Sequence, residues 1–263
     1  MKLCRFQPLL FNPDSITPAP RYGVIRGAQL REISGDIFGT WTDTANTWPL
    51  EDVKLLAPVT PSKIVFIGRN YREHAAELGN AVPKEPLIFL KPPSSVIGPE
   101  EPILLPPISR RVDHEGELAV VIAKTCSQLG PAGAVRPYLL GYTCLNDVTA
   151  LDIQKADVQF TRGKGFDTFC PIGPFMETEF DLGAATVETF VNGQRRQSAP
   201  AAEMIFSVDV IIRWIAQVMT LLPGDVVATG TPSGVGPLTA GDVVEVSITG
   251  IGTLRNPVAW RET

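Results

Sequence analysis

The stretch VDHEGELAVVIA, residues 112–123, joins two glutamates to a continuous apolar run. A short apolar run that is rich in β-branched residues is typical of a buried strand, and we expect one over residues 115–123. Because side chains alternate along a strand, Glu115 and Glu117 would point to one face and His114 to the other. The stretch therefore predicts a buried strand with two carboxylates at its mouth.

Elsewhere in the chain, strand patterns outnumber helical ones. A helix is expected over residues 208–221 with Ser207 as its N-cap, and a shorter one over residues 71–78, ended by Gly79. Many strands, about three helices and no regular βαβ alternation predict a strand-rich α+β fold rather than a doubly wound sheet. Further strands are expected at 63–67, 87–90, 139–145, 186–192, 225–229 and 242–248, and a hairpin at 22–33.

Two prolines, Pro58 and Pro61, mark the best candidate for a domain boundary, since proline is barred from helix interiors and central strands. We predict a small N-terminal β domain over residues 1–60 and a larger catalytic domain over residues 61–263. With 263 residues, of which 44% are hydrophobic, the chain can bury a substantial core.

Charge and cysteine usage exclude several classes of protein. The net charge is −5 and the basic residues are scattered, which argues against a nucleic-acid partner. No apolar run reaches the roughly 18 residues that a membrane span needs. The four cysteines form no Cys-x-x-Cys pair, which favours a reducing compartment, and we expect a cytoplasmic protein.

A third carboxylate, Asp147, ends another apolar segment and could converge with Glu115 and Glu117 on one ion. Carboxylate oxygens are the ligands that Mg²⁺ and Mn²⁺ prefer. The alternative is that the two glutamates lie on a solvated strand edge and that Asp147 caps a helix beginning near Val148.

A strand followed by Gly68-Arg69-Asn70-Tyr71 leads into the short helix that carries His74 and Glu77. A carboxylate three residues after a histidine lies on the same helix face and can orient the imidazole as a general base. An ordinary surface pair is the alternative. Arg69 could bind a substrate carboxylate and Tyr71 could donate a hydrogen bond, although either could equally pack with its polar tip in water.

Two glycine-rich segments carry further candidates. Lys164 lies between two glycines, which would let backbone and ammonium approach a ligand closely, although a flexible surface loop has the same pattern. The loop over residues 230–237, which includes Thr231, offers backbone amides and hydroxyls suited to a carboxylate. It lacks the Gly-Lys-Ser/Thr ending of a phosphate-binding loop, so we reject a nucleotide site.

Taken in order, these motifs resemble the fumarylacetoacetate hydrolase family over about residues 61–258. The resemblance implies the family's mixed β-sandwich roll, usually as a homodimer. It further implies Mg²⁺ or Mn²⁺, or Ca²⁺ in crystals, on Glu115, Glu117 and Asp147, a catalytic His74–Glu77 dyad, and charge stabilisation by Lys164. Gln154, Arg69 and Thr231 would line the substrate pocket. The motifs are GRNY (68–71), FLKP (89–92), HEGE (114–117), ND (146–147), CPIGP (170–174), VNG (191–193), MIFS (204–207) and GTPSGVG (230–236).

Asn70 stands where fumarylacetoacetate hydrolases proper place a further metal-binding aspartate, so the chain is more similar to the shorter acylpyruvase and isomerase branch. That branch implies hydrolysis of a C–C bond in a small acylpyruvate-like 2-oxo acid, of the kind met in aromatic compound catabolism. Isomerisation, decarboxylation or tautomerisation at the same site is the alternative, and a non-catalytic metal-binding protein is the alternative from another class.

Overall fold

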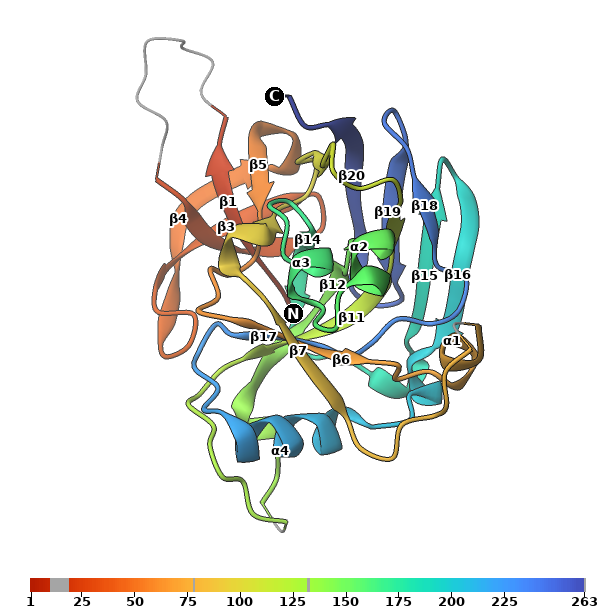
Figure 1. The fold of residues 1–263 in the computed structure, drawn as a ribbon. Helices are drawn as coiled ribbons and strands as arrows, with labels where there is room; N and C mark the ends of the chain where they lie inside the picture. The colour runs from red at the N-terminus through yellow and green to blue at the C-terminus, as the bar shows by residue number, and fades with distance from the viewer. Residues whose placement is uncertain (10–18, 78, 132, 263) are drawn as a thin grey trace.

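The computed structural model describes residues 1–9, 19–77, 79–131 and 133–262. Its centre is a large sheet in which β11 lies between β12 and β17 (Figure 1). The order of the sheet is β4-β3-β2-β1-β14-β12-β11-β17-β6-β7, and β5 and β8 pair with β1 and β14. The strands are β1 Lys2–Pro8, β2 Arg21–Arg26, β3 Gln29–Gly35, β4 Trp41–Pro49, β5 Val53–Leu56, β6 Ile64–Gly68, β7 Leu87–Lys91, β8 Val96–Ile97, β11 Gly116–Ile122, β12 Leu139–Asn146, β14 Cys170–Glu177 and β17 Val226–Ala228.

Two smaller sheets and four α-helices complete the described part of the chain. One sheet has the order β13-β10-β18, and the other has the order β16-β15-β19-β20-β9. The strands are β9 Ile103–Leu105, β10 Val112–His114, β13 Thr149–Ala150, β15 Thr186–Val191, β16 Gln194–Pro200, β18 Gly236–Leu238, β19 Val243–Ile248 and β20 Gly252–Trp260. The helices are α1 Arg72–Glu77, α2 Leu151–Ala156, α3 Thr161–Lys164 and α4 Val208–Val218, with 3-10 turns at Leu50–Asp52, Pro93–Ser95, Arg136–Tyr138, Leu182–Ala184 and Ala201–Glu203.

Both faces of β11 are buried, which explains its unbroken apolar sequence. Leu118, Val120 and Ile122 belong to the core cluster that also contains the apolar side of α4. Ala119 and Val121 belong to a second cluster on the opposite face of the sheet. The strand-rich α+β class is therefore confirmed, with β11 as the buried strand that its sequence predicts.

The helix α4 begins as expected but ends early. The Ser207 side chain accepts a hydrogen bond from the Val210 N–H and caps the first turn. The helix stops at Val218 instead of residue 221, because Leu221 leaves the helical path and pairs with Cys126. Both backbone hydrogen bonds of that bridge measure 2.9 Å. Within the described ranges no helix is long and apolar enough to cross a membrane.

The remaining expected strands are all present, with ends that differ by one or two residues. The helix α1 covers residues 72–77, and Leu78, which the expected helix included, lies outside the described residues. The expected hairpin is β2 and β3, joined through Gly27 at a φ of 65°. In the N-terminal part, β1 pairs with β14 as well as with β2 and β5, so it extends the main sheet. The division at residue 60 stays a prediction.

Candidate active site

A cavity of about 390 Å³ opens where β6 and β12 end and β11 begins, and it lies in the usual size range of small-molecule sites. Every site residue predicted from the sequence lines this cavity except Tyr71. The predicted residues that line it are Arg69, His74, Glu77, Glu115, Glu117, Asp147, Gln154, Lys164 and Thr231.

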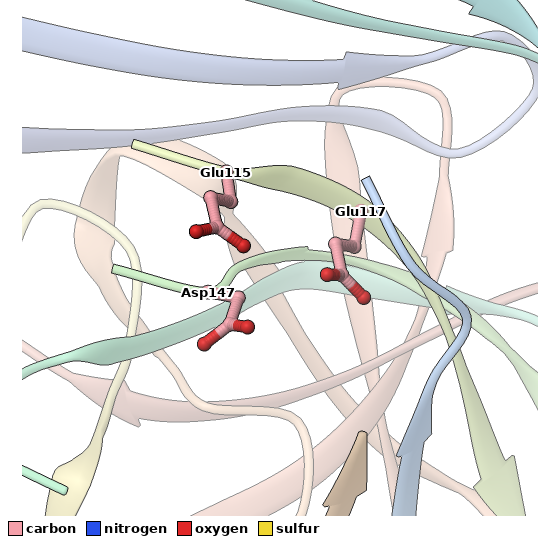
Figure 2. A group of neighbouring side chains, drawn as sticks. All are labelled: Glu115, Glu117 and Asp147. Carbon is pink, nitrogen blue, oxygen red and sulfur yellow. The ribbon is translucent and has the colours of Figure 1, made fainter. Parts of the chain in front are cut away.

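Three carboxylates converge at the inner end of the cavity. Glu117 belongs to the start of β11, and Glu115 lies between β10 and β11. Asp147 follows β12 directly, and its N–H donates to the Glu115 carbonyl at 2.8 Å. One oxygen from each side chain lies within 4.8 Å of the others (Figure 2). Glu117 and Asp147 are only 2% and 1% exposed, so the solvated strand edge is excluded.

The alternative that Asp147 caps a helix beginning near Val148 is wrong. Thr149–Ala150 forms β13, and α2 begins only at Leu151 with Ala150 as its N-cap. The chain is held extended here because β13 pairs with β10. The Asp147 side chain is therefore not needed at a helix terminus and faces the other carboxylates.

Two buried lysines contact the cluster. The Lys164 ammonium donates to Asp147 Oδ2 at 2.5 Å, to Glu115 Oε2 at 3.1 Å and to Thr149 Oγ1 at 2.8 Å. Lys91 Nζ lies 2.5 Å from Asp147 Oδ1. Lys164 belongs to the short helix α3, so the alternative of a flexible surface loop is wrong. Gly163 is required there, since a Cβ atom would lie 2.9 Å from the Gln154 backbone.

The two kinds of charge shift each other's pKa values. Burial raises the pKa of Glu117 well above its usual value, and Asp147 and Glu115 raise it further. Burial alone would raise the pKa of Asp147, but Lys164 and Lys91 outweigh it and hold that pKa low. Burial would lower the pKa of Lys164, but Asp147 and Glu115 outweigh it and raise that pKa. The buried Glu117 carboxyl therefore favours its protonated form in the metal-free protein, whereas Asp147 and Lys164 favour their charged forms.

The donor set fits a hard divalent cation. Lys164 and Lys91 pair with Asp147 and Glu115, but among the described residues no ion pair reaches Glu117, which is almost fully buried beside both carboxylates. A divalent cation would supply positive charge to all three. Mg²⁺ and Mn²⁺ prefer oxygen ligands of this kind. The sequence-predicted set of Glu115, Glu117 and Asp147 is the set that the structure brings together.

The substitution Glu117→Gln is expected to stabilise the metal-free protein at neutral pH. A raised carboxyl pKa means that the folded state binds the proton more tightly, so ionisation costs stability once the pH exceeds the unfolded value of about 4.3. The gain should therefore vanish below about pH 4.3, grow between that pH and the raised folded pKa, and become constant above the folded pKa. Calorimetric melting of both proteins in chelator checks this, and a constant difference across that range would contradict it.

The predicted dyad faces the cavity from α1. His74 is 4% exposed, and its Nδ1 lies 3.4 Å from Glu77 Oε2. Glu77 also accepts the Gly234 N–H at 3.1 Å, which anchors its carboxylate. A buried imidazole with an anchored carboxylate beside it is suited to moving a proton, and an ordinary surface pair does not describe it.

The glycine-rich loop binds carboxylates of the protein itself. The Gly230 N–H donates to Glu117 Oε2 at 2.7 Å, and the Gly234 N–H donates to Glu77. Thr231 lines the cavity, but its hydroxyl donates to the Gly116 carbonyl at 2.8 Å and accepts from Gln197. The loop therefore positions the metal cluster and the dyad together.

The predicted substrate-binding residues differ in their placement. Arg69 lines the cavity with a φ of 58°, a strained conformation that is common at functional sites. The Gln154 Oε1 atom is buried and accepts no hydrogen bond from the described residues. A buried polar atom without a partner is expected where a ligand supplies the missing hydrogen bond. Tyr71 is 2% exposed and lies outside the cavity lining, so the structure does not place it among the groups that face a ligand.

Several residues contact the site although the sequence predicts no role for them there. Lys91 belongs to the FLKP motif, for which no role is predicted. A lysine at the end of an apolar strand could have indicated that it faces a site. Gln197 contacts His114 Nδ1 at 3.2 Å and accepts the Gly116 N–H at 2.9 Å. The Asn70 amide donates hydrogen bonds to the Thr229 and Phe206 carbonyls and accepts one from the Phe206 N–H. Asn70 therefore fixes the backbone just before the 230–237 loop and is not a metal ligand.

Known sequences match nearly the whole chain. The model of the fumarylacetoacetate (FAA) hydrolase C-terminal family matches residues 63–259, and that of the Rv2993c-like N-terminal family matches residues 1–58. Protein Rv2993c of Mycobacterium tuberculosis is 51% identical over 87% of this chain and 87% of its own length. Oxaloacetate tautomerase YisK of Bacillus subtilis is 42% identical over 80% of this chain and 75% of its own length.

Solved structures show the same fold over the full length. The 5-carboxymethyl-2-hydroxymuconate delta-isomerase from Mycobacterium smegmatis is 43% identical with a TM-score of 0.90, covering 99% of this chain and 100% of its own. The maleylpyruvate hydrolase from Sphingobium sp., solved with manganese(II) and pyruvate, is 30% identical with a TM-score of 0.79 and full coverage of both chains. On these matches, the chain belongs to the fumarylacetoacetate hydrolase family of enzymes.

Proposed function

We propose that the protein is a divalent-metal-dependent enzyme that hydrolyses a C–C bond in a small acylpyruvate-like 2-oxo acid. One observation carries the proposal: the carboxylate cluster and the His74–Glu77 dyad line the same cavity, so one small ligand can meet both. A cavity lined by a metal site, a proton-transfer group and a few polar side chains is the arrangement expected of such an enzyme.

Glu115, Glu117 and Asp147 would hold Mg²⁺ or Mn²⁺. When bound, such an ion supplies Lewis-acid stabilisation of negative charge on the oxygens of a 2-oxo acid. The manganese and pyruvate of the Sphingobium hydrolase support this choice of ion and of substrate class.

The His74–Glu77 dyad supplies the proton transfers of the proposed hydrolysis. His74 takes a proton from water, and the hydroxide formed adds to the acyl carbonyl of the substrate. The C–C bond to the pyruvyl methylene then breaks, and its electron pair stays on that carbon. The carbon takes up the proton from His74, which gives a carboxylic acid and pyruvate from one substrate and one water.

The remaining side chains bind and orient the substrate. The Lys164 ammonium, fixed beside Asp147 and Glu115, places positive charge at the end of the cavity where negative charge develops. Gln154, whose Oε1 has no hydrogen-bond partner in the described part of the chain, and Arg69 are the groups we assign to the rest of the substrate. Arg69 fits a second carboxylate.

Proton transfer without hydrolysis is the second candidate, as in tautomerisation or isomerisation of a 2-oxo acid. Sequence identity favours this candidate. The Mycobacterium smegmatis isomerase and the Bacillus subtilis tautomerase are 43% and 42% identical to this chain, whereas the Sphingobium hydrolase is 30% identical. The same dyad would then move a proton between substrate positions, and no water would attack.

Product analysis separates the candidates. The purified protein with Mg²⁺ or Mn²⁺ is incubated with acetylpyruvate, fumarylpyruvate and oxaloacetate, and the products are separated by chromatography. We expect pyruvate together with the acyl acid in equal amounts. An isomer of unchanged mass would establish the second candidate, carbon dioxide would indicate a decarboxylase, and no turnover of any substrate would favour the non-catalytic alternative.

A further inference from the structure

Gln197 is a buried side chain of β16 that contacts two segments of the candidate active site without lining the cavity. Its Oε1 accepts the Gly116 N–H at 2.9 Å and contacts His114 Nδ1 at 3.2 Å. Its Nε2 donates to Thr231 Oγ1 and to the Pro232 carbonyl, both at 2.7 Å. A glutamine amide has two acceptor lone pairs and two N–H donors, so these four contacts use its full capacity.

Backbone groups fix the orientation of this amide. The Gly116 N–H can only donate and therefore faces the Gln197 oxygen, whereas the Pro232 carbonyl can only accept and therefore faces the amide nitrogen. A flipped amide would place two donors together at Gly116 and two acceptors together at Pro232. His114 Nδ1 faces the oxygen as well and therefore carries a proton. The side chain is thus held in one orientation from four directions.

Gln197 and Thr231 close a ring of hydrogen bonds with both backbone groups of Gly116. The Gly116 N–H donates to Gln197, Gln197 donates to the Thr231 hydroxyl, and that hydroxyl donates to the Gly116 carbonyl at 2.8 Å. Gly116 has no room for a side chain, because a Cβ atom there would collide with Thr189 Oγ1. Since Gly116 lies between the two glutamates of the cluster, the ring fixes the backbone from which both project.

The same ring holds the 230–237 loop against the start of β11. Two backbone N–H groups of this loop donate into the site: that of Gly230 to Glu117 Oε2 at 2.7 Å, and that of Gly234 to Glu77 at 3.1 Å. The first orients a carboxylate of the cluster, and the second orients the carboxylate of the dyad. A side chain that fixes the place of this loop therefore sets both contacts.

We propose that Gln197 is a positioning residue that aligns the carboxylate cluster with the dyad on α1, by fixing the 230–237 loop against Gly116. This inference rests on the proposed function of the cluster as a divalent metal site. Gln197 lies outside the cavity lining, so its replacement removes no group that meets an ion or a substrate. The effect passes through Glu117 and Glu77, so metal affinity and turnover fall together.

Calorimetric titration of the metal-free protein with Mn²⁺ tests the inference. Gln197→Met keeps the length of the side chain and removes its four hydrogen bonds. It should weaken Mn²⁺ binding by about 10–100-fold, the usual scale for a residue that supports a metal ligand. The kcat at saturating Mn²⁺ should fall as well, by about 10²-fold, the scale of a misplacement of about 1 Å.

Asn256→Leu is the matched control. The Asn256 amide is equally buried, donates to the Gly98 and Glu101 carbonyls, and lies outside the cavity lining. Its loss also leaves buried backbone groups without a partner, but at a distance from the ring. Asn256→Leu should lower the melting temperature and leave the affinity for Mn²⁺ at the wild-type value.

A double-mutant cycle with Thr231→Val separates positioning through the ring from a general loss of packing. Loss of either side chain breaks the ring, so the second substitution has little left to remove. The double variant should therefore bind Mn²⁺ about as weakly as the weaker of the two single variants. Independent effects would instead multiply.

Wild-type Mn²⁺ affinity or wild-type kcat in Gln197→Met would overturn the inference, and so would an equal loss of affinity in Asn256→Leu or multiplied losses in the double variant. Gln197→Asn replaces the methionine variant if that protein does not fold, because the shorter amide cannot reach Gly116 and Thr231 together. A wild type that binds no Mn²⁺ would remove the metal site and this role with it. Affinities that change as expected in a protein without turnover would remove only the proposed reaction.

Discussion

Replacement of His74 by alanine is expected to lower kcat by about 10²–10⁴-fold, the usual contribution of a positioned general base. Metal affinity should not change, because His74 lies on α1 and is not part of the carboxylate cluster. Steady-state kinetics with the active substrate, combined with calorimetric titration of the metal, measures both quantities.

Glu73→Ala is the control for the His74 variant. Glu73 belongs to the same helix but bonds to Ser233 and does not line the cavity, so its loss tests whether any change in α1 harms turnover. We expect near wild-type kcat for Glu73→Ala. Unchanged turnover in His74→Ala would remove the assignment of His74 as the base.

The substitution Asp147→Asn is expected to abolish metal binding and to destabilise the protein by about 3–5 kcal/mol, the usual cost of removing one partner of a buried ion pair. Asp147 is the shared partner of Lys91 and Lys164, which are both buried. The neutral amide leaves these ammonium groups with less negative charge nearby. Urea unfolding gives the loss in free energy, and calorimetric titration gives the loss of metal binding.

Asp225→Asn separates the two effects. Asp225 is also fully buried and pairs with Lys63, but it lies outside the cavity lining. It should lower stability and leave metal affinity intact. Wild-type metal affinity in Asp147→Asn would show that Asp147 is not a ligand.

The sequence predicted the cluster because it depends on local rules. Alternation along a strand places Glu115 and Glu117 on one face, and a strand end places Asp147 at the same edge. The spacing of His74 and Glu77 predicted their contact for the same reason. The resemblance to a known family then turned an ambiguous pair of glutamates into an expected metal site.

Features that depend on long-range packing were not predictable from local patterns. Lys91 and Asp147 are 56 residues apart in the chain, and they come into contact only because the end of β7 lies near the end of β12. The early end of α4 depends on Leu221 pairing with Cys126. The burial of Tyr71 outside the cavity lining likewise follows from no local pattern. The homodimer implied by the resemblance stays a prediction, which light scattering in solution would test.

The most direct test of the central claim is the restoration of turnover by a divalent ion. The protein is treated with chelator, dialysed, and assayed with the acylpyruvate and oxaloacetate substrates before and after Mg²⁺ or Mn²⁺ is added. We predict no turnover without the ion and full turnover with it, lost again in Glu117→Gln, which removes a ligand from the cluster. Turnover that persists in chelator, or that survives in Glu117→Gln, would contradict a metal-dependent site at these carboxylates.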